Sequence, residues 1–367
     1  MTPREGVALA PWTTLGVGGP ARFFIEPASE GELVEALAWA LARDLPTLIL
    51  GGGSNLLVAD RGFDGLVIRP RLEGIESRIV SRIEPREEGA AISVEAGAGV
   101  RWDDLVAHAV SHGWAGVECL SGIPGDVGAT PIQNVGAYGQ EVADTLRSVR
   151  AIDRRTLAAR EIDAADCGFG YRDSVFKSTS AGRFVITRVR LSLVPGGAPK
   201  IGYAELAKKL AHVASPSLAA VRAAVLDLRR DKSMLLDPDP EAENGKSAGS
   251  FFTNPIVDAE HLARVEERAR DAGVLAQGEA MPRWPAGSRM KLSAAWLIER
   301  AGFRKGSGEG RVGISTRHSL AIVNRGGATA AEIVAFARRV RDGVRDRFAV
   351  TLGAEPVLVG FRDDEVP

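Results

Sequence analysis

The sequence predicts an α+β fold divided into two domains, and three observations support this prediction. At 367 residues the chain exceeds the length at which one hydrophobic core usually stops growing. In its first half, short β-rich runs alternate with amphipathic helical runs. A proline- and glycine-rich stretch at residues 195–203 then leads into a more helical remainder. We therefore expect one α+β domain over residues 1–195 and a second over residues 200–367.

The elements expected in the first domain follow in order. Strands are expected in ARFFIEP and in LPTLILGGGSNLLVA, where a glycine turn interrupts the run. Between them, Ser29 and Glu32 form a capping-box pattern before a helical run. A strand in AAISVEAGAGV is followed by a helix that we expect to end at Gly113. Two further strands are expected in LRSVRAIDRRT and RFVITRVRLSLV.

The second domain has its own elements. Helices are expected in SLAAVRAAVLDLRRDK and LSAAWLIERAG, with the polar loop DPDPEAENGKSAG between them, and a strand is expected in LAIVN. Thr329 and Glu332 form a capping box for a last long helix. We expect its apolar stripe to comprise Ile333, Phe336, Val340 and Val344, and a final strand to lie in EPVLVG.

Composition favours small-molecule partners. A formal net charge of -1 gives no support for nucleic acid or an anionic membrane as the partner. The start MTPREGVALAPWTTLG has no signal-peptide pattern, and no run of about 18 apolar residues occurs, so we expect a cytoplasmic protein. The oligomeric state is left open, a monomer included.

Cysteine and histidine spacing argues against a metal site. The two cysteines, Cys119 and Cys167, form no CxxC pattern, and the five histidines show no HExxH spacing. His108 and His112 are four residues apart on an expected helix, but no nearby carboxylate or cysteine completes a ligand set. We expect this pair to serve packing or the surface.

Three segments of the first domain are rich in glycine: residues 48–58, 94–100 and 120–141. The last, LSGIPGDVGATPIQNVGAYGQE, holds five glycines and two prolines. Glycine allows backbone N–H groups to form a nest for phosphate. However, GGGSN is not GxGxxG and leads into a strand, and the chain contains no GxxxxGK[ST], so the Rossmann and P-loop interpretations fail.

Two interpretations of these segments remain, tight turns or a ligand site. Polar residues among the glycines favour a ligand: Ser54, Asn55, Thr130, Gln133 and Asn134. A ligand with a pyrophosphate and a hydrogen-bonding ring would use them all. A flavin dinucleotide has both parts.

Segments along almost the whole chain resemble the UDP-N-acetylenolpyruvoylglucosamine reductases of bacterial cell-wall synthesis. The matching segments are WTTLGVGGPA, LILGGGSNLLV, GIPGDVGATPIQNVGAYGQE, GYRDSVFK, AGSFFTNP, KLSAAWLIERAGF and EPVLVG. The resemblance implies an FAD-binding domain of the vanillyl-alcohol-oxidase (PCMH) type. It also implies a C-terminal α+β substrate-binding domain, with the final strand returning to the active site.

The resemblance implies that NADPH reduces FAD, and that hydride then passes from flavin N5 to C3 of UDP-N-acetylglucosamine enolpyruvate. Non-covalent FAD is expected, because neither LILGGGSNLLV nor VEAGAGV holds a histidine or cysteine that could tether it. The segment from Pro124 to Gly128 would lie near the pyrophosphate, and that from Gln133 to Tyr138 near the ring. The implied FAD contacts are Gly51, Gly52, Gly53, Ser54, Asn55, Pro124, Gly125, Gly128, Thr130, Gln133, Asn134, Gly136 and Tyr138.

Three residues match the catalytic positions of the family. Arg172 would stabilise the enolate, and Ser250 would give a proton to C2. Glu355 would be an acidic partner, protonated when it faces the substrate carboxylate. By residue type alone, Arg172 could instead pair with Asp173, Ser250 could be a turn or cap residue, and Glu355 could simply be solvated.

The resemblance also implies substrate contacts. Tyr203 matches a mobile-loop tyrosine that closes over the nucleotide diphosphate, and a lysine such as Lys232 would act there as a point charge. His318 could equally serve strand packing. The full set of implied contacts is Tyr171, Tyr203, Lys232, Asn254 and His318.

The chain departs from the family pattern at TTLG, at Thr253 and in a long spacer before AGSFF. Because of this spacer, the assignment of Lys232 depends on its RxxK pattern and not on its distance from Ser250 in the sequence.

Two rival functions are weighed against the reductase. One is an FAD-dependent oxidase of the same fold that acts on a sugar or alcohol. The other is a catalytically silent nucleotide-sugar binding protein, which a yellow purified protein would exclude.

Overall fold

The computed structural model of the chain describes residues 2–81, 90–236 and 242–366, and these residues form two compact units. The first unit combines Met1–Val7, Ala21–Gly52 and Asp64–Leu235. The second combines Ala8–Pro20, Gly53–Phe63 and Leu236–Pro367. Both units mix helices and strands, which confirms the α+β class.

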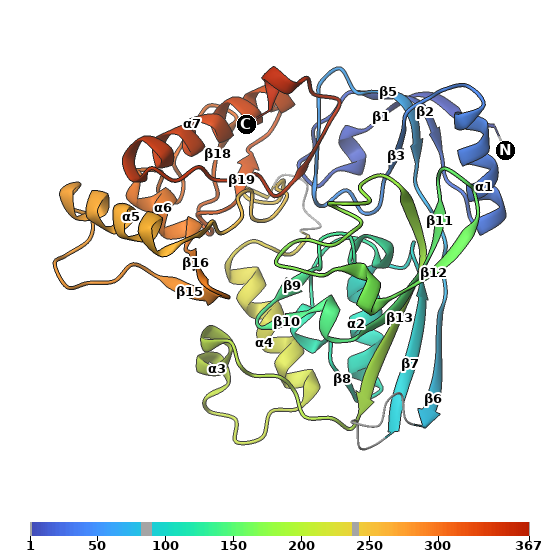
Figure 1. Ribbon diagram of the computed structural model, residues 1–367, viewed down its shortest axis with the longest axis horizontal. Coiled ribbons are helices and arrows are strands. Elements are labelled where there is room, and N and C mark those ends of the chain that lie inside the picture. Colours follow the sequence, from blue (N-terminus) through green and yellow to red (C-terminus); the bar gives the residue numbers. More distant parts are fainter. Residues whose placement is uncertain (1, 82–89, 237–241, 367) are drawn as a thin grey trace. The chain divides into compact units, whose positions relative to one another are not determined.

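The main sheet of the first unit has six strands over its described residues, and every printed pair in it is antiparallel. Its order is β12-β11-β13-β7-β6, with the short β8 paired to the end of β13. Figure 1 shows β6, β7, β13 and β11 side by side. The strand bounds are β6 Ile75–Ser81, β7 Ala90–Gly97, β8 Trp114–Ala115, β11 Leu146–Asp153, β12 Ala159–Asp163 and β13 Phe184–Pro195.

A smaller sheet has the order β1-β2-β5-β3, and α1 (Glu30–Leu41) packs against residues of this sheet. The side chain of Ser29 accepts a hydrogen bond from Glu32 N–H at the start of α1, which is one half of the predicted capping box. The other half is absent, because Glu32 Oε2 accepts from Ala28 N–H instead of Ser29 N–H. Buried residues recur at helical spacing along α1, so that one face is apolar. The strand bounds are β1 Arg4–Ala8, β2 Pro20–Ile25, β3 Thr47–Ile49 and β5 Phe63–Ile68.

The helix α2 (Trp102–Ser111) belongs to the core of the main sheet. Trp102 is fully buried, and its indole N–H donates to the carbonyl of Leu120 at 3.1 Å. The chain leaves the helix at Gly113, whose φ of 72° suits a glycine after a helix end. This end was predicted correctly. Trp102 also ties α2 to the glycine-rich segment that begins at Leu120.

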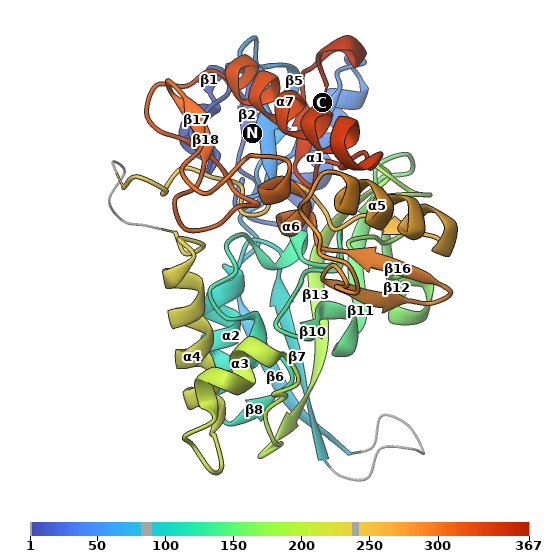
Figure 2. The same ribbon diagram turned by 90° about the vertical axis from the view of Figure 1, so that its left-hand side faces the viewer.

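The boundary between the units differs from the one expected near residues 195–200. Both α3 (Ala204–Leu210) and α4 (Leu218–Asp231) lie in the first unit, which runs to Leu235. Apolar residues of both helices pack around Cys119 and Tyr138. Figure 2 shows α2, α3 and α4 gathered together. The proline- and glycine-rich stretch is therefore a connection within this unit.

The second unit contains helices and short strands around one core. Its longest helix, α7, begins with the predicted capping box of Thr329 and Glu332, and the predicted apolar stripe is buried. The element bounds are β4 Leu56–Val58, β14 Ile256–Val257, α5 Ala259–Asp271, β15 Arg283–Ala286, β16 Arg289–Leu292, α6 Ala294–Arg300, β17 Gly308–Glu309, β18 Val312–Ile314, β19 Ile322–Asn324, α7 Ala330–Phe348 and β20 Val357–Val359.

The last strand, β20, pairs in parallel with β4. Because β4 follows Gly53, Ser54 and Asn55, this pairing places the C-terminal strand beside the residues after the glycine turn. Within the described residues, no helix has both the length and the apolar character that a membrane span needs.

Candidate functional site

The turn after β3 and the segment before Val127 approach each other closely within the first unit. A Cβ atom on Gly52 would lie 2.7 Å from the Cα atom of Gly125, closer than such atoms pack. A Cβ atom on Gly51 would meet nothing nearer than Ala129 Cβ at 3.6 Å. Packing of the chain therefore requires glycine at position 52, whereas space is left at position 51.

We call Gly51, Gly52, Gly125 and Asp126 the glycine cradle. Among the residues that the structure describes, none accepts a hydrogen bond from the four backbone N–H groups of the cradle. Grouped N–H donors of this kind form nests for anions. The cradle thus has two features that suit the pyrophosphate of a dinucleotide: its unused donors and the absence of side chains on its three glycines.

The other glycines of the long segment are explained by packing of the chain itself. A Cβ atom on Gly128 would lie 2.5 Å from Ala98 Cβ, and one on Gly136 would lie 2.8 Å from Glu141 Cγ. Thr130 is 3% exposed, and its hydroxyl donates to the carbonyl of Val127 at 2.8 Å. The tight-turn interpretation therefore accounts for part of this segment without a ligand.

Asn134 uses its side chain within the protein. Its Nδ2 donates to Glu141 Oε2 at 2.8 Å and to the carbonyl of Gly170 at 3.1 Å. Its Oδ1 accepts from Ala143 N–H at 3.0 Å. Since both amide donors are engaged, any FAD contact here would use the backbone. The neighbouring Gln133 is half-buried, as is Pro124 earlier in the segment.

The residues after the turn, Gly53, Ser54 and Asn55, belong to the second unit. Gly53 has φ 64°, and a Cβ atom there would overlap the carbonyl oxygen of Trp12. Asn55 Nδ2 donates to the carbonyl of Glu355 at 3.3 Å, and its own carbonyl accepts from Val357 N–H at 2.9 Å. Asn55 therefore joins an expected cofactor segment to an expected catalytic residue.

Arg172 lies beside the glycine-rich segment in the first unit. Its Nη2 donates to the carbonyl of Gly136 at 2.7 Å, and its φ of 55° is unusual for a residue other than glycine. Lys177 Nζ donates to the carbonyl of Arg172 at 2.9 Å. The ring of Tyr171 lies 5.5 Å from the guanidinium carbon. Asp173, the alternative partner, has Oδ1 accepting from Ser174 N–H at 2.8 Å.

Two expected substrate contacts, Tyr203 and Lys232, lie near the ring of Tyr138. Its ring lies 5.5 Å from that of Tyr203 in an edge-on arrangement, and Lys232 Nζ lies 5.9 Å from its centroid. Tyr138 is 9% exposed and Tyr203 is 43% exposed. Burial raises the pKa of Tyr138 to about 12. Lys232 also pairs with Glu205 at 2.5 Å. The sequence did not point to Glu205, which begins α3.

Ser250 and His318 are neighbours in the second unit, although they are 68 positions apart in the chain. Ser250 Oγ lies 3.4 Å from His318 Nε2. The buried hydroxyl oxygen of Ser315 accepts from His318 N–H at 3.2 Å and holds that backbone in place. Sequence reasoning treated the serine and the histidine separately, and no local spacing could have joined them.

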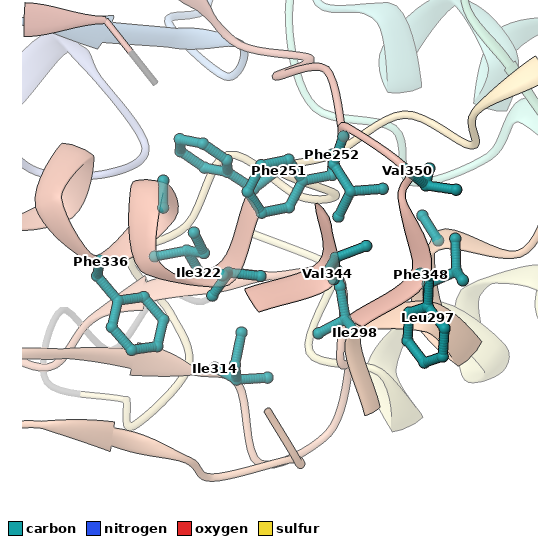
Figure 3. Close-up of a cluster of buried hydrophobic side chains, with 14 of the residues drawn as sticks. Phe251, Phe252, Leu297, Ile298, Ile314, Ile322, Phe336, Val344, Phe348 and Val350 are labelled. Carbon is teal, nitrogen blue, oxygen red and sulfur yellow. The ribbon is translucent and has the colours of Figure 1, made fainter. Parts of the chain in front are cut away.

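The residues after Ser250 form a rigid support. Phe251 N–H donates to the carbonyl of Leu320 at 2.7 Å, and Phe251 accepts from Glu355 N–H at 2.9 Å. Phe251 and Phe252 are 0% and 1% exposed. Figure 3 shows both rings in the core with Ile322. The backbone pairing therefore brings Glu355 next to the serine motif.

Asn254 has a structural contact of its own. Its Oδ1 accepts from Ala294 N–H at 3.0 Å, at the start of α6. Ser293 caps the same helix by accepting from Trp296 N–H. The nucleotide contact expected of Asn254 stays a prediction.

Two buried ionisable residues near the glycine-rich segment were missed by the sequence reasoning. Arg229 is 5% exposed, and its Nε donates to the carbonyl of Gly122 at 3.0 Å. Asp126 is 8% exposed, and burial raises its pKa to about 6. An acid among five glycines was the available signal for Asp126.

A charged cavity of about 290 Å³ lies on the main sheet. Arg190 pairs with Glu95 at 2.8 Å and with Glu161 at 3.4 Å, and Arg188 pairs with Glu95 at 3.2 Å. In these ion pairs, the charges of Arg188 and Arg190 are neutralised by those of Glu95 and Glu161. The cavity is lined by Glu95, Arg150, Glu161, Arg188 and Arg190.

No group of three or more His, Cys, Asp or Glu in the described part of the chain could hold a metal ion. The rings of His108 and His112 lie 4.3 Å apart, and His112 stacks on Trp114 at 4.7 Å. Both rings contact Trp114, and His112 is exposed, so packing and surface roles remain the expectation for this pair.

Two family models match the chain. Residues 21–156 match an FAD binding domain, and residues 239–359 match the C-terminal domain of UDP-N-acetylenolpyruvoylglucosamine reductase. The first match confirms the expected FAD-binding fold and cofactor.

Two relatives and one solved structure are similar to this chain over nearly its full length. The reductase of that name from Thermobifida fusca is 49% identical, over 97% of this chain and 98% of the relative. The one from Nocardia farcinica is 48% identical, over 98% of this chain and 91% of the relative. The crystal structure of the Thermus caldophilus reductase is 28% identical, with a TM-score of 0.63 over 97% of this chain and 99% of that one. The chain therefore belongs to the family of UDP-N-acetylenolpyruvoylglucosamine reductases, which are FAD-dependent oxidoreductases.

Proposed function

We propose that the chain reduces UDP-N-acetylglucosamine enolpyruvate to UDP-N-acetylmuramate with NADPH, as a step of peptidoglycan precursor synthesis. The observation that carries this proposal is the pairing around Ser250. Glu355 N–H donates to Phe251 at 2.9 Å, and Ser250 Oγ lies 3.4 Å from His318 Nε2. The family of the chain supports the substrate and the cofactor. The expected cytoplasmic location stays a prediction.

Bound FAD would supply the hydride to C3 of the enolpyruvyl group, after receiving it from NADPH. Negative charge then develops on the enolate of the substrate. We assign its stabilisation to Arg172, because a guanidinium is always charged and can bind a carboxylate with two N–H groups. Its contact with the carbonyl of Gly136 at 2.7 Å would hold the guanidinium in place before the substrate arrives.

Ser250 would then donate a proton to C2. A hydroxyl is a weak acid, but the acceptor is a strongly basic carbanion, so the transfer is feasible where geometry is fixed. The buried rings of Phe251 and Phe252 support that geometry. His318, 3.4 Å from the hydroxyl, is near enough to return a proton to Ser250 after turnover.

The remaining residues would hold the substrate. Glu355 would be protonated there, because a carboxylate would repel the substrate carboxylate. Lys232 would bind the diphosphate as a point charge, exchanging its partner Glu205 for the phosphate. Tyr203 is 43% exposed and in edge-on contact with Tyr138, so its ring could cover a bound nucleotide.

Isotope placement tests the proposed reaction directly. Turnover in D₂O should place solvent deuterium at C2 of the product, where the proton is delivered. NADPH deuterated at the transferred position should label C3 only when transfer to the substrate is faster than exchange of the flavin N5–H with solvent. Absence of solvent deuterium from C2 would contradict protonation at that carbon, and absence of product from this substrate would contradict the reaction itself.

A further inference from the structure

The carboxylate of Asp126 occupies an unusual position in the glycine cradle. Its Oδ1 would lie 3.4 Å from a Cβ atom at Gly52, and its Oδ2 would lie 3.7 Å from one at Gly51. The side chain is 8% exposed, and no described residue donates a hydrogen bond to its carboxylate. A largely buried acid without a donor from the protein is uncommon, and its oxygens depend on the little solvent that still reaches them.

Backbone hydrogen bonds hold the segment around Asp126 in place. Trp102 N–H donates to Gly125 at 2.9 Å, and Ala129 N–H donates to Asp126 at 3.0 Å. Arg101 and Asp126 also form an isolated bridge between their segments. These contacts fix the backbone from which the Asp126 carboxylate reaches Gly51 and Gly52.

The cradle would consequently hold two anions close together. Its four unused N–H groups suit the pyrophosphate of FAD, yet the carboxylate of Asp126 lies against the same glycines. Two negative charges in a partly buried site repel strongly, and such repulsion is relieved when one group is protonated.

We propose that Asp126 takes up one proton from solvent when FAD binds, so that a neutral carboxylic acid lies beside the pyrophosphate. The carboxylate gains a proton and becomes a hydrogen-bond donor to a phosphate oxygen. This inference rests on the FAD-binding domain, and not on the substrate proposed above.

The surrounding charges allow this protonation. Arg69, Arg71 and Arg101 lower the pKa of Asp126, but burial outweighs them and raises it to about 6. Two of these arginines are themselves engaged, since Arg69 pairs with Glu26 at 3.1 Å and Arg71 with Glu73 at 3.3 Å. The negative charge of Glu73 raises the pKa of Asp126, as burial does. A nearby pyrophosphate would raise the pKa further.

FAD binding should weaken as the pH rises above about 6. Below about pH 6 the acid is already neutral, so binding needs no proton. Above that pH each bound FAD requires proton uptake, and the Kd should rise by up to about tenfold per pH unit.

The test is calorimetric titration of the full chain, stripped of cofactor, with FAD at about pH 7.5 in two buffers of different ionisation enthalpy. We expect uptake that approaches one proton per FAD, and a Kd that rises with pH. Asp126→Asn should bind FAD with no proton uptake and a Kd independent of pH. Glu73→Gln is the matched control and should keep the uptake.

Zero uptake in the wild-type protein would overturn the proposal, as would equal uptake in Asp126→Asn. Asp126→Ser provides a second neutral variant if the asparagine protein fails to fold, and the wild-type comparison of buffers stands without either. Because turnover is not measured, a failure here is separate from failure of the proposed reaction.

Discussion

The glycine cradle and the serine motif, Ser250–Thr253, are built in opposite ways. The cradle takes its form from missing side chains: Gly52 leaves room for Gly125, and four N–H groups have no described acceptor. The serine motif takes its form from filled space, because Phe251 and Phe252 are buried in the core. Cofactor binding and proton delivery thus depend on different physical features, and mutations should separate them.

The largest expected effect is at Ser250. In Ser250→Ala we expect turnover of the enolpyruvyl substrate to fall by about a thousandfold, because the proton donor is lost. FAD affinity and flavin reduction by NADPH should be unchanged, since the cradle is untouched. Steady-state and single half-reaction kinetics measure the two effects. Thr253→Ala is the control and should keep turnover within about twofold; normal turnover in Ser250→Ala would remove the serine from the mechanism.

Two neighbouring glycines sharpen the account of the cradle. Gly52→Ala should lower the free energy of unfolding by about 2 kcal/mol and impair FAD binding, because its Cβ meets Gly125 Cα at 2.7 Å. Gly51→Ala should fold normally, since its nearest contact is 3.6 Å. It should still raise the Kd for FAD about tenfold by placing a methyl group in the cradle. Denaturant unfolding and FAD titration measure the pair.

An unchanged FAD affinity in Gly51→Ala would contradict this account. The turn would then serve architecture alone, as the tight-turn interpretation holds.

Lys232 tests the substrate side of the first unit. Lys232→Met should raise the KM for the UDP-sugar about tenfold with a smaller change in kcat, because a charge contact with the diphosphate is lost. Lys209→Met is a matched control, since Lys209 lies in the last turn of α3 and also pairs with an acid, Asp227, at 3.4 Å. Equal changes in both variants would show a general effect of charge rather than a specific contact.

The smallest effect should come from the charged cavity. Arg190→Gln removes contacts to Glu95 and Glu161, but these pairs are partly exposed, so we expect a loss of stability below about 1 kcal/mol. FAD affinity and turnover should not change. A large loss of either function would show that this cavity takes part in the reaction.

Features set by neighbouring residues could be predicted from the sequence. The capping box and apolar stripe of α7 depend on spacings of three and four residues, and both are present. The turn at GGGSN leads into a strand, as expected. Family motifs assigned Tyr138 to the cofactor and Tyr203 and Lys232 to the substrate, and both of these lie near the ring of Tyr138, although their ligand contacts stay predictions.

Features set by distant contacts could not be predicted. The approach of Ser250 to His318 depends on backbone bonds from Phe251 to Leu320 and Glu355. The side chain of Asn134 was expected to serve a ligand, yet its donors are engaged by Glu141 and Gly170. Whether a polar group is already engaged is decided by tertiary structure, and no local pattern contains that information.

The central claim is the reductase reaction, and an anaerobic visible spectrum of the purified protein tests it most directly. NADPH should bleach the flavin absorbance, and UDP-N-acetylglucosamine enolpyruvate should restore it without oxygen. Absorbance that returns only when oxygen is admitted would contradict the proposed substrate and favour an oxidase of the same fold.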